Sequence, residues 1–293
     1  MKNISYNTYL GKLIFLLFFL TIFIGFYFNE DASSGGASND FQLTWGYVLA
    51  LQKNLFIKNN IWTIHLPLHY IILSKINFLI KDQNLLRLFF CFVSALVPLL
   101  FYLNLKLKFD HINKNLLLSL ASIIFILPAF RSSAIWANSH ITGLIFFLLS
   151  TLFFLKWKKQ NNYKSIDLYI IFQIIFLSLA VYCRQYYALI FFYFMAIYFK
   201  KLNIKMFIFL SAIIFLFSLP GFWFIMQQPH TLSVTFSNEL QNSLLVNSSI
   251  ISFYLLPIAF CLSIKNKISF QKKENYLLFS IFLSFFIVFL LLI

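Results

Sequence analysis

The chain has 293 residues, of which 61% are hydrophobic, 21% aromatic and only 11% charged, and its mean hydropathy is +0.85. A soluble domain has about a quarter charged residues, so this composition excludes an ordinary soluble globular protein and predicts an all-α integral membrane protein, a multi-span helical bundle. The net charge of +15 does not indicate nucleic-acid binding, because the lysines gather between apolar segments and instead predict membrane topology.

Nine apolar segments are candidate spans, and together they predict a single transmembrane domain over residues 1–293. The first is about 19 residues long and lacks a small-residue cleavage site, so it is expected to be a retained span rather than a signal peptide. The three cysteines lie in or beside apolar segments and favour neither a disulfide nor a metal–thiolate site. The candidate spans are 10–28, 86–105, 115–130, 139–157, 167–183, 186–200, 204–227, 248–265 and 277–293.

The loops between these spans alternate in charge. Sixteen of the 23 basic residues fall on one side and seven on the other if the N-terminus is cytoplasmic, and the loop at 228–247 contains neither Lys nor Arg. Lysine-rich loops resist translocation, so a cytoplasmic N-terminus is expected. The preference for Lys, Asn, Ile and Phe over Arg is typical of an AT-rich genome and favours a bacterial inner membrane.

The first external loop, residues 29–85, is too long for a simple connection and too apolar for a disordered segment. Within it, FQLTWGYVLALQ at 41–52 has apolar residues at helical spacing, and LHYIILSKINFLI at 68–80 is apolar but too short to span a bilayer. Both segments predict amphipathic helices that lie in the membrane interface. A loop held only by contact with lipid is the structural alternative.

This loop begins with an unusual concentration of acid and glycine, NEDASSGGASND at 29–40. Glu30, Asp31 and Asp40 are three of the eight acidic residues of the chain. The two neighbouring glycines permit a tight backbone turn that would bring the acids to face one cavity. The loop is therefore the predicted location of a catalytic site. The alternative is that the acids terminate a span and solvate a turn.

Only three of the basic residues are arginines, and each lies at the outer end of a predicted span. Arg87 opens the second span, Arg131 closes the third and Arg184 closes the fifth. A planar guanidinium group suits bidentate contact with phosphate oxygens better than an ammonium group does, so the three are candidate ligands of an external phosphate. Arginines at helix ends that reach lipid headgroups are the alternative.

The stretch WTIHLPLHYIILSKI at 62–76 resembles a motif of the GT-C class of membrane glycosyltransferases, the superfamily of polyprenyl- or dolichyl-phosphate-sugar-dependent enzymes that includes protein mannosyltransferases. These enzymes often carry Pro-Pro-Leu-x-Tyr in their first external loop. Here Leu66 replaces the first proline, whereas Pro67, Leu68 and Tyr70 keep the rest.

Further segments resemble the same class in their order along the chain. KDQNLLRLFFCFVSALVPLLFYL at 81–103 resembles the second span, and RSSAIWAN at 131–138 and LAVYCRQYYALIFFY at 179–193 resemble the outer ends of later spans. The family places an acid, often Asp-Glu, before the amphipathic helix. Asn39-Asp40 takes that place here, and Glu30-Asp31 has the reverse order.

The resemblance covers residues 10–200 and implies an inverting hexosyl- or pentosyltransferase with its active site on the periplasmic face. It would move a sugar from a polyprenyl-phosphate donor to a lipid, glycan or protein acceptor. Members often have eleven or more spans, so a chain ending in apolar sequence at Ile293 is expected to be a fragment or a short variant. Its expected partners are the donor and membrane lipid, with no nucleic acid. The sequence assigns no oligomeric state.

The chemistry of such a transfer assigns roles to the residues. A base must take the proton of the acceptor hydroxyl and cations must stabilise the departing phosphate, the latter being the role of the three arginines. The sequence assigns no definite cofactor, and the acids are compatible with a divalent cation. The candidate catalytic residues are Asp40, Asp31 and Glu30, and the candidate substrate-binding residues are His65, Pro67, His69, Tyr70, Asn138, His140 and Gln185.

Two other functions fit a multi-span chain. An O-antigen polymerase or ligase also handles lipid-linked sugars with external arginines and histidines, but its main external loop usually lies late in the chain. A transporter predicts charged or Gly/Pro-broken spans near the bilayer midplane and an internal repeat. The sequence shows few such charges, and Pro220-Gly221 is its clearest break.

Overall fold

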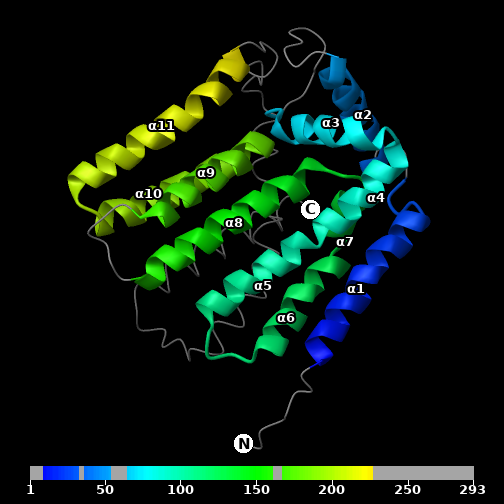
Figure 1. Cartoon of the computed structure of the whole chain (residues 1–293), viewed down its shortest axis with the longest axis horizontal. Helices are drawn as coiled ribbons and strands as arrows, with labels where there is room; N and C mark the ends of the chain where they lie inside the picture. Colours follow the sequence, from blue (N-terminus) through cyan, green and yellow to red (C-terminus); the bar gives the residue numbers. More distant parts are fainter. Residues whose placement is uncertain (1–8, 33–35, 54–64, 161–166, 227–293) are drawn as a thin grey trace, which may run out of the picture. The chain divides into compact units, whose positions relative to one another are not determined.

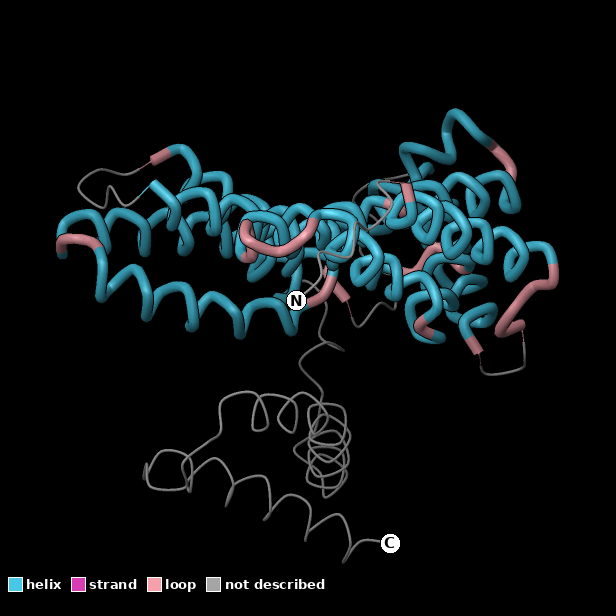
Figure 2. Tube along the Cα trace, turned by 90° about the horizontal axis from the view of Figure 1, so that it is seen from below, coloured by secondary structure: helices cyan, strands magenta, loops and turns pink. Residues whose placement is uncertain are grey.

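A computed structural model describes residues 9–32, 36–53, 65–160 and 167–226. These residues form helices and loops with no strand among them (Figures 1 and 2), which confirms the all-α expectation. They belong to the first of two compact units, Met1–Thr231; the second is Leu232–Ile293. The helices are α1 Leu10–Tyr27, α2 Ala37–Lys53, α3 Leu68–Ile80, α4 Gln83–Ser94, α5 Leu96–Lys108, α6 Lys114–Ser122, η1 Ile123–Ile126, α7 Pro128–Ile135, α8 Ser139–Gln160, α9 Leu168–Cys183, η2 Gln185–Tyr187, α10 Ala188–Lys201 and α11 Ile204–Met226.

Four stretches of the described chain are long and apolar enough to cross a membrane: α1, the α4–α5 pair over Gln83–Lys108, α8, and α11 over Ile204–Phe224. They coincide with four of the predicted spans. The segments predicted at 167–183 and 186–200 are helical as α9 and α10, but with 16 and 14 residues they are shorter than the roughly 20 residues that cross a bilayer upright. The spans predicted at 248–265 and 277–293 lie outside the described residues.

The third predicted span, 115–130, is not one straight helix. The helical segment Lys114–Ile126 ends, and α7 begins at Pro128 with its axis turned by 69°. Pro128 forces this break, because a residue that precedes proline is driven out of the α conformation, and Leu127 has ψ 123°. The prediction that Arg131 closes a straight third span is therefore wrong. Arg131 lies on α7, the helix that follows the bend.

Two apolar cores share α8. The first joins α1, α4 and α7 to the first half of α8 and includes Ile22, Leu86 and Ile141. The second joins the last half of α8 to α9 and α10 and includes Trp157 and Ile174. α8 carries buried side chains along most of its length. It therefore packs against α5 and α7 as well as against α9 (Figure 1).

The helices predicted at 41–52 and 68–80 are present as α2 and α3 and pack against each other at one end of the assembly (Figure 1). Pro67 is the N-cap of α3, which confirms the predicted helix start. Asp40 lies in the first turn of α2, where a negative charge is favourable beside the positive end of the helix dipole. Asp82 caps α4 by accepting a hydrogen bond from the Leu85 amide at 2.7 Å.

Close contact between α1 and α6 depends on Gly11. A Cβ atom at this position would lie 2.6 Å from the carbonyl oxygen of Asn115 on α6. Gly11→Ala is therefore expected to lower the free energy of unfolding by about 1–3 kcal/mol, because the two backbones must separate. Thermal unfolding in detergent, followed by circular dichroism, measures the change.

Gly46→Ala is the matched control, because a Cβ atom at Gly46 in α2 meets nothing within 4 Å. The same change there should raise the stability by about 0.5–1 kcal/mol through helix propensity alone. Equal effects of the two substitutions would show that the backbone contact between α1 and α6 does not limit the packing.

Candidate functional site

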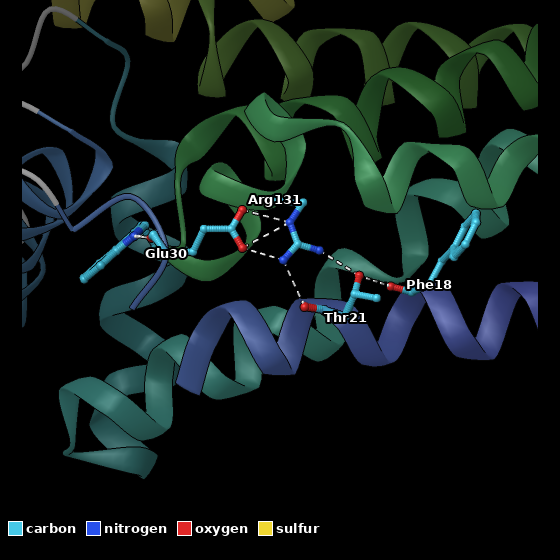
Figure 3. A network of polar contacts seen from close by, with 5 residues as sticks. Phe18, Thr21, Glu30 and Arg131 are labelled. Carbon is cyan, nitrogen blue, oxygen red and sulfur yellow. Dashed lines mark hydrogen bonds and ion pairs between the residues drawn. The ribbon is translucent and has the colours of Figure 1, made fainter. Parts of the chain in front are cut away.

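The turn that follows α1 (residues 28–32) is held by an ion pair with α7. Asn29 and Asp31 have positive φ values of 49° and 62°, so the backbone reverses and carries Glu30 back toward α1. Arg131 donates from Nε to Glu30 Oε1 at 2.8 Å and also pairs through Nη2 with Glu30 Oε2. Its remaining donors go to Thr21, to the hydroxyl at 2.7 Å and to the carbonyl at 3.1 Å (Figure 3).

Three hydrogen bonds join Arg131 to Glu30. The hydrogen bond from Arg131 lowers the pKa of Glu30 below its ordinary value of 4.5, although partial burial and the charge of Asp31 oppose the lowering. Gly25 leaves the room for the pair, since a Cβ atom there would collide with Glu30 and Arg131. Glu30 is thus ionised, and its negative charge neutralises the positive charge of Arg131.

Arg87 lies next to this pair and is 5% exposed. Its Nε donates to the carbonyl of Ile135 at 3.2 Å, and its two Nη atoms donate to Asn84 and Asn29, each at 3.3 Å. The centre of the guanidinium group lies 3.6 Å from the ring centroid of Trp136. All three guanidinium nitrogens of Arg87 therefore have partners in the protein, and the residue joins α4 to α7 and to the turn after α1.

Asp31 is also engaged by its surroundings. One carboxylate oxygen accepts from the hydroxyl of Ser132 at 2.5 Å and from the backbone amide of Ala37 at 3.3 Å. The second bond satisfies a free N–H group at the first turn of α2. Asp31 thereby fixes the start of α2 and ties it to α7.

A second group of polar residues surrounds Arg184, at the end of α9. Arg184 donates to Asn138 Oδ1 at 2.8 Å and contacts His65 Nε2. His65 Nδ1 is 3.2 Å from Gln185 Oε1, so the ring donates to the amide oxygen and accepts from Arg184. We name His65, Asn138, Arg184 and Gln185 the Arg184 group.

Charge and burial in the Arg184 group favour binding of an anion. Burial and the charge of Arg184 lower the pKa of His65 below its ordinary 6.5, while the bond to Gln185 and the charge of Asp40 oppose this lowering. His65 is therefore neutral at pH 7. Arg184 Nε is buried and makes no hydrogen bond within the described residues, an unfavourable state for a charged donor.

Asp40 is the acid whose charge acts on the Arg184 group. Its side chain is exposed, and its charge acts on His65, Tyr70 and Arg184. Burial lowers the pKa of Arg184, and the nearby phenols together with Asp40 oppose that effect. An exposed carboxylate beside a half-buried guanidinium and a neutral imidazole is an arrangement that can take up a proton while the guanidinium binds an anion.

The remaining predicted site residues are divided between this group and the core. His140 lies beside it, with Nδ1 3.3 Å from the hydroxyl of Tyr186 and the two rings stacked. His69, by contrast, has no exposed surface, and its nitrogens bond to Thr142 Oγ1 and the Ala137 carbonyl, each at 2.9 Å. His69, which was predicted to contact substrate, therefore holds α3 to α8 and to the turn between α7 and α8.

Tyr70 is also mostly buried, at 6% exposure, and packs on Tyr47 with 5.4 Å between ring centroids. The three arginines that were predicted to share one phosphate site thus fall into two groups, with Arg87 and Arg131 beside the turn after α1 and Arg184 beside Asp40. Trp136 and Tyr186 are among the residues of these groups that were absent from the predicted set, as are Thr21, Asn29, Asn84 and Ser132. The Tyr-Tyr pair after Gln185 is a signal that could have indicated Tyr186.

Within the described residues, no three His, Cys, Asp or Glu side chains lie close enough together to hold a metal ion. No protein-family model, curated protein or solved structure was found to match the chain.

Proposed function

We propose that the protein is a GT-C-like membrane glycosyltransferase whose site comprises Asp40 and the Arg184 group. One observation carries the proposal. Asp40, the His65–Tyr70 stretch and the Asn138 and Arg184 positions are far apart in sequence, yet their side chains lie within electrostatic or hydrogen-bonding reach of one another. These are the motifs whose order along the chain resembles the GT-C class.

The proposed reaction transfers a sugar from a polyprenyl-phosphate donor with inversion. The acceptor hydroxyl oxygen forms a bond to the anomeric carbon as the bond from that carbon to the phosphate oxygen breaks. Asp40 takes the proton of the acceptor hydroxyl, and polyprenyl phosphate leaves with the bonding electron pair. Arg184 binds the phosphate through its fork of donors and stabilises the negative charge that develops on it.

Each of the other candidate residues receives a role in this proposal. Asn138 and neutral His65 orient Arg184, and His140 with Tyr186 forms a wall beside it. Glu30, Arg87 and Arg131 hold the turn after α1 and are positioning residues. The proposed setting is a bacterial inner membrane with a cytoplasmic N-terminus and the α2–α3 end of the helices in the periplasm.

The test is an assay of the purified protein with a radiolabelled polyprenyl-phosphate hexose in detergent or liposomes, with release of polyprenyl phosphate as the readout. Arg184→Lys is expected to raise the KM for the donor about tenfold or more, because an ammonium group loses the bidentate fork and one charged hydrogen bond contributes about 1.5–3 kcal/mol. The fall in kcat should be smaller than the rise in KM.

Lys75→Gln on α3 is the matched control, since it removes an exposed positive charge from the helix that follows His65 without changing a residue of the Arg184 group. An equal rise in the KM for the donor in Lys75→Gln would mean that Arg184 only attracts the negatively charged donor and does not bind its phosphate specifically. Release of polyprenyl diphosphate instead of the monophosphate would favour a polymerase or ligase, and movement of an intact solute across liposomes would favour a transporter.

A further inference from the structure

Pro220 lies inside α11 and interrupts the hydrogen bonding of that helix. A proline has no N–H group to donate to the carbonyl four residues before it, and its ring crowds that carbonyl. Membrane helices keep such prolines where a neighbouring helix or side chain bonds to the backbone around the break. Because α11 packs against α9 (Figure 1), α9 is a helix that can supply such bonds.

The hydroxyl of Tyr182, at the end of α9, bonds to α11 on both sides of Pro220. Its oxygen accepts a hydrogen bond from the backbone N–H of Gly221 at 3.1 Å, and the hydroxyl donates to the carbonyl of Phe217. These two backbone groups are four residues apart, the spacing at which a regular α-helix bonds them to each other. A side chain that enters the backbone ladder at such a point allows the helix to bend there.

Gly221 allows the two helices to approach this closely. Gly221 is buried, and a Cβ atom at this position would lie 3.1 Å from Cε1 of Tyr182 and 3.5 Å from Cδ1 of Leu66. Tyr182 precedes Arg184 by two residues, and Leu66 directly follows His65. The break in α11 therefore packs against chain neighbours of two members of the Arg184 group.

Little other packing fixes α11 near the break. Phe215, Leu216 and Phe222 are 63%, 61% and 64% exposed. In a bilayer, the burial of such side chains does not drive helices together, and close packing and hydrogen bonds between helices take over that role. The bonds of the Tyr182 hydroxyl are therefore expected to decide how firmly this part of α11 is held.

We infer that Tyr182 is a positioning residue, whose hydroxyl latches α11 at the Pro220 break and so fixes α11 against the segments that carry His65 and Arg184. When the hydroxyl is lost, α11 bends at Pro220 and its contact with Leu66 opens, which leaves the Arg184 group without support on this side. The effect on donor binding rests on the proposed function, whereas the latch is a property of the two helices and can be measured without substrate.

Hydrogen–deuterium exchange of the full-length protein in detergent tests the latch. Tyr182→Phe keeps the ring and removes the hydroxyl. The backbone amides within 217–224 should then exchange about tenfold faster, since each lost hydrogen bond contributes a factor of about 2–12. The amides of 204–214, in the half of α11 before the break, should exchange as they do in the original protein.

Tyr169→Phe is the matched control, because it makes the same change in the same helix about 20 Å from Tyr182 and keeps the ring that packs on Phe153. It should leave exchange within 217–224 unaltered. Unchanged exchange in Tyr182→Phe, or an equal acceleration in Tyr169→Phe, would overturn the latch.

Pro220→Ala separates the latch from simple ring packing. It restores the N–H group that bonds to the Leu216 carbonyl, so α11 no longer needs the hydroxyl. Added to Pro220→Ala, the change Tyr182→Phe should alter exchange within 217–224 by less than about twofold. A full tenfold effect in this background would show that Tyr182 does not act through the proline break, and would overturn the inference.

The positioning role is tested in the transferase assay. Tyr182→Phe should raise the KM for the donor about threefold or more and leave kcat within about twofold, because an unlatched population lowers the apparent affinity while bound donor restores the latched state. Faster exchange with an unchanged KM would overturn the positioning role. Absence of transfer by the original protein would refute the proposed function and the positioning role with it, whereas the latch is decided by exchange alone.

Discussion

Asp40→Asn is expected to lower turnover by about 10²–10⁴-fold, the usual contribution of a general base, while the affinity for the lipid-linked donor changes by less than about twofold. The amide keeps the shape of the carboxylate but cannot take the proton of the acceptor hydroxyl. Single-turnover transfer and donor binding, measured separately on the same preparation, distinguish the two effects. Asp40 is exposed in the first turn of α2, so the variant should fold normally.

Asp31→Asn is the control for this prediction. Asp31 already accepts hydrogen bonds from Ser132 and the Ala37 amide, and an asparagine oxygen can accept the same bonds. Turnover of this variant should remain within a few-fold of the original. Loss of turnover in Asp31→Asn together with full activity in Asp40→Asn would assign the base to Asp31 and refute the proposed site.

Arg131→Met is expected to lower the free energy of unfolding by about 2–3 kcal/mol, because it leaves Glu30 and the Thr21 carbonyl without their donors. The arginine side chain is only 15% exposed, whereas Glu30 is 37% exposed, so Glu30→Gln should cost less, about 0.5–1 kcal/mol. In a double-mutant cycle the pair should show a coupling energy of about 0.5–1 kcal/mol. Additive effects would show that the ion pair contributes nothing to stability.

The same pair predicts a dependence of stability on pH. The pKa of Glu30 is lower in the folded protein than its ordinary 4.5, so below about pH 4.5 the unfolded chain binds more protons than the folded one. The stability that the pair provides is therefore present above pH 4.5 and is lost as the pH falls through the folded pKa. Thermal unfolding followed from pH 5 down to about pH 2 should show a steeper loss for the original protein than for Glu30→Gln.

The helical elements were the most predictable part of the structure, because they follow from short-range patterns. Runs of apolar residues long enough for a bilayer predict α1, α8 and α11, and the shorter apolar stretches predict α2 and α3. Pro67 predicts where α3 begins, because a proline is tolerated at a helix start and excludes helix before it. The bend before α7 also has a visible cause in Pro128, but apolar composition alone favours a continuous span.

The partners of the arginines were less predictable, because they depend on how separate helices pack. Arg131 and Glu30 are 101 residues apart, and a sequence places both at the same membrane level without showing that they meet. The same reasoning predicts a phosphate ligand at Arg87, although the aromatic face of Trp136 and nearby carbonyl oxygens surround its guanidinium group. Arg184 differs because its Nε remains unpaired in the described structure.

Three segments that precede the short helix α7 bind it and the turn after it: the turn after α1, α3 and α4. All three precede α7 in the sequence. Because a chain is synthesised from its N-terminus, every one of these partners has already left the ribosome when α7 emerges. These three sets of contacts can therefore form as soon as α7 emerges, whereas its packing on α8 and the bond from Arg184 to Asn138 come later. The Arg184 group forms only after α9 has been added, so the scaffold of the site is complete before the residue that binds the anion arrives.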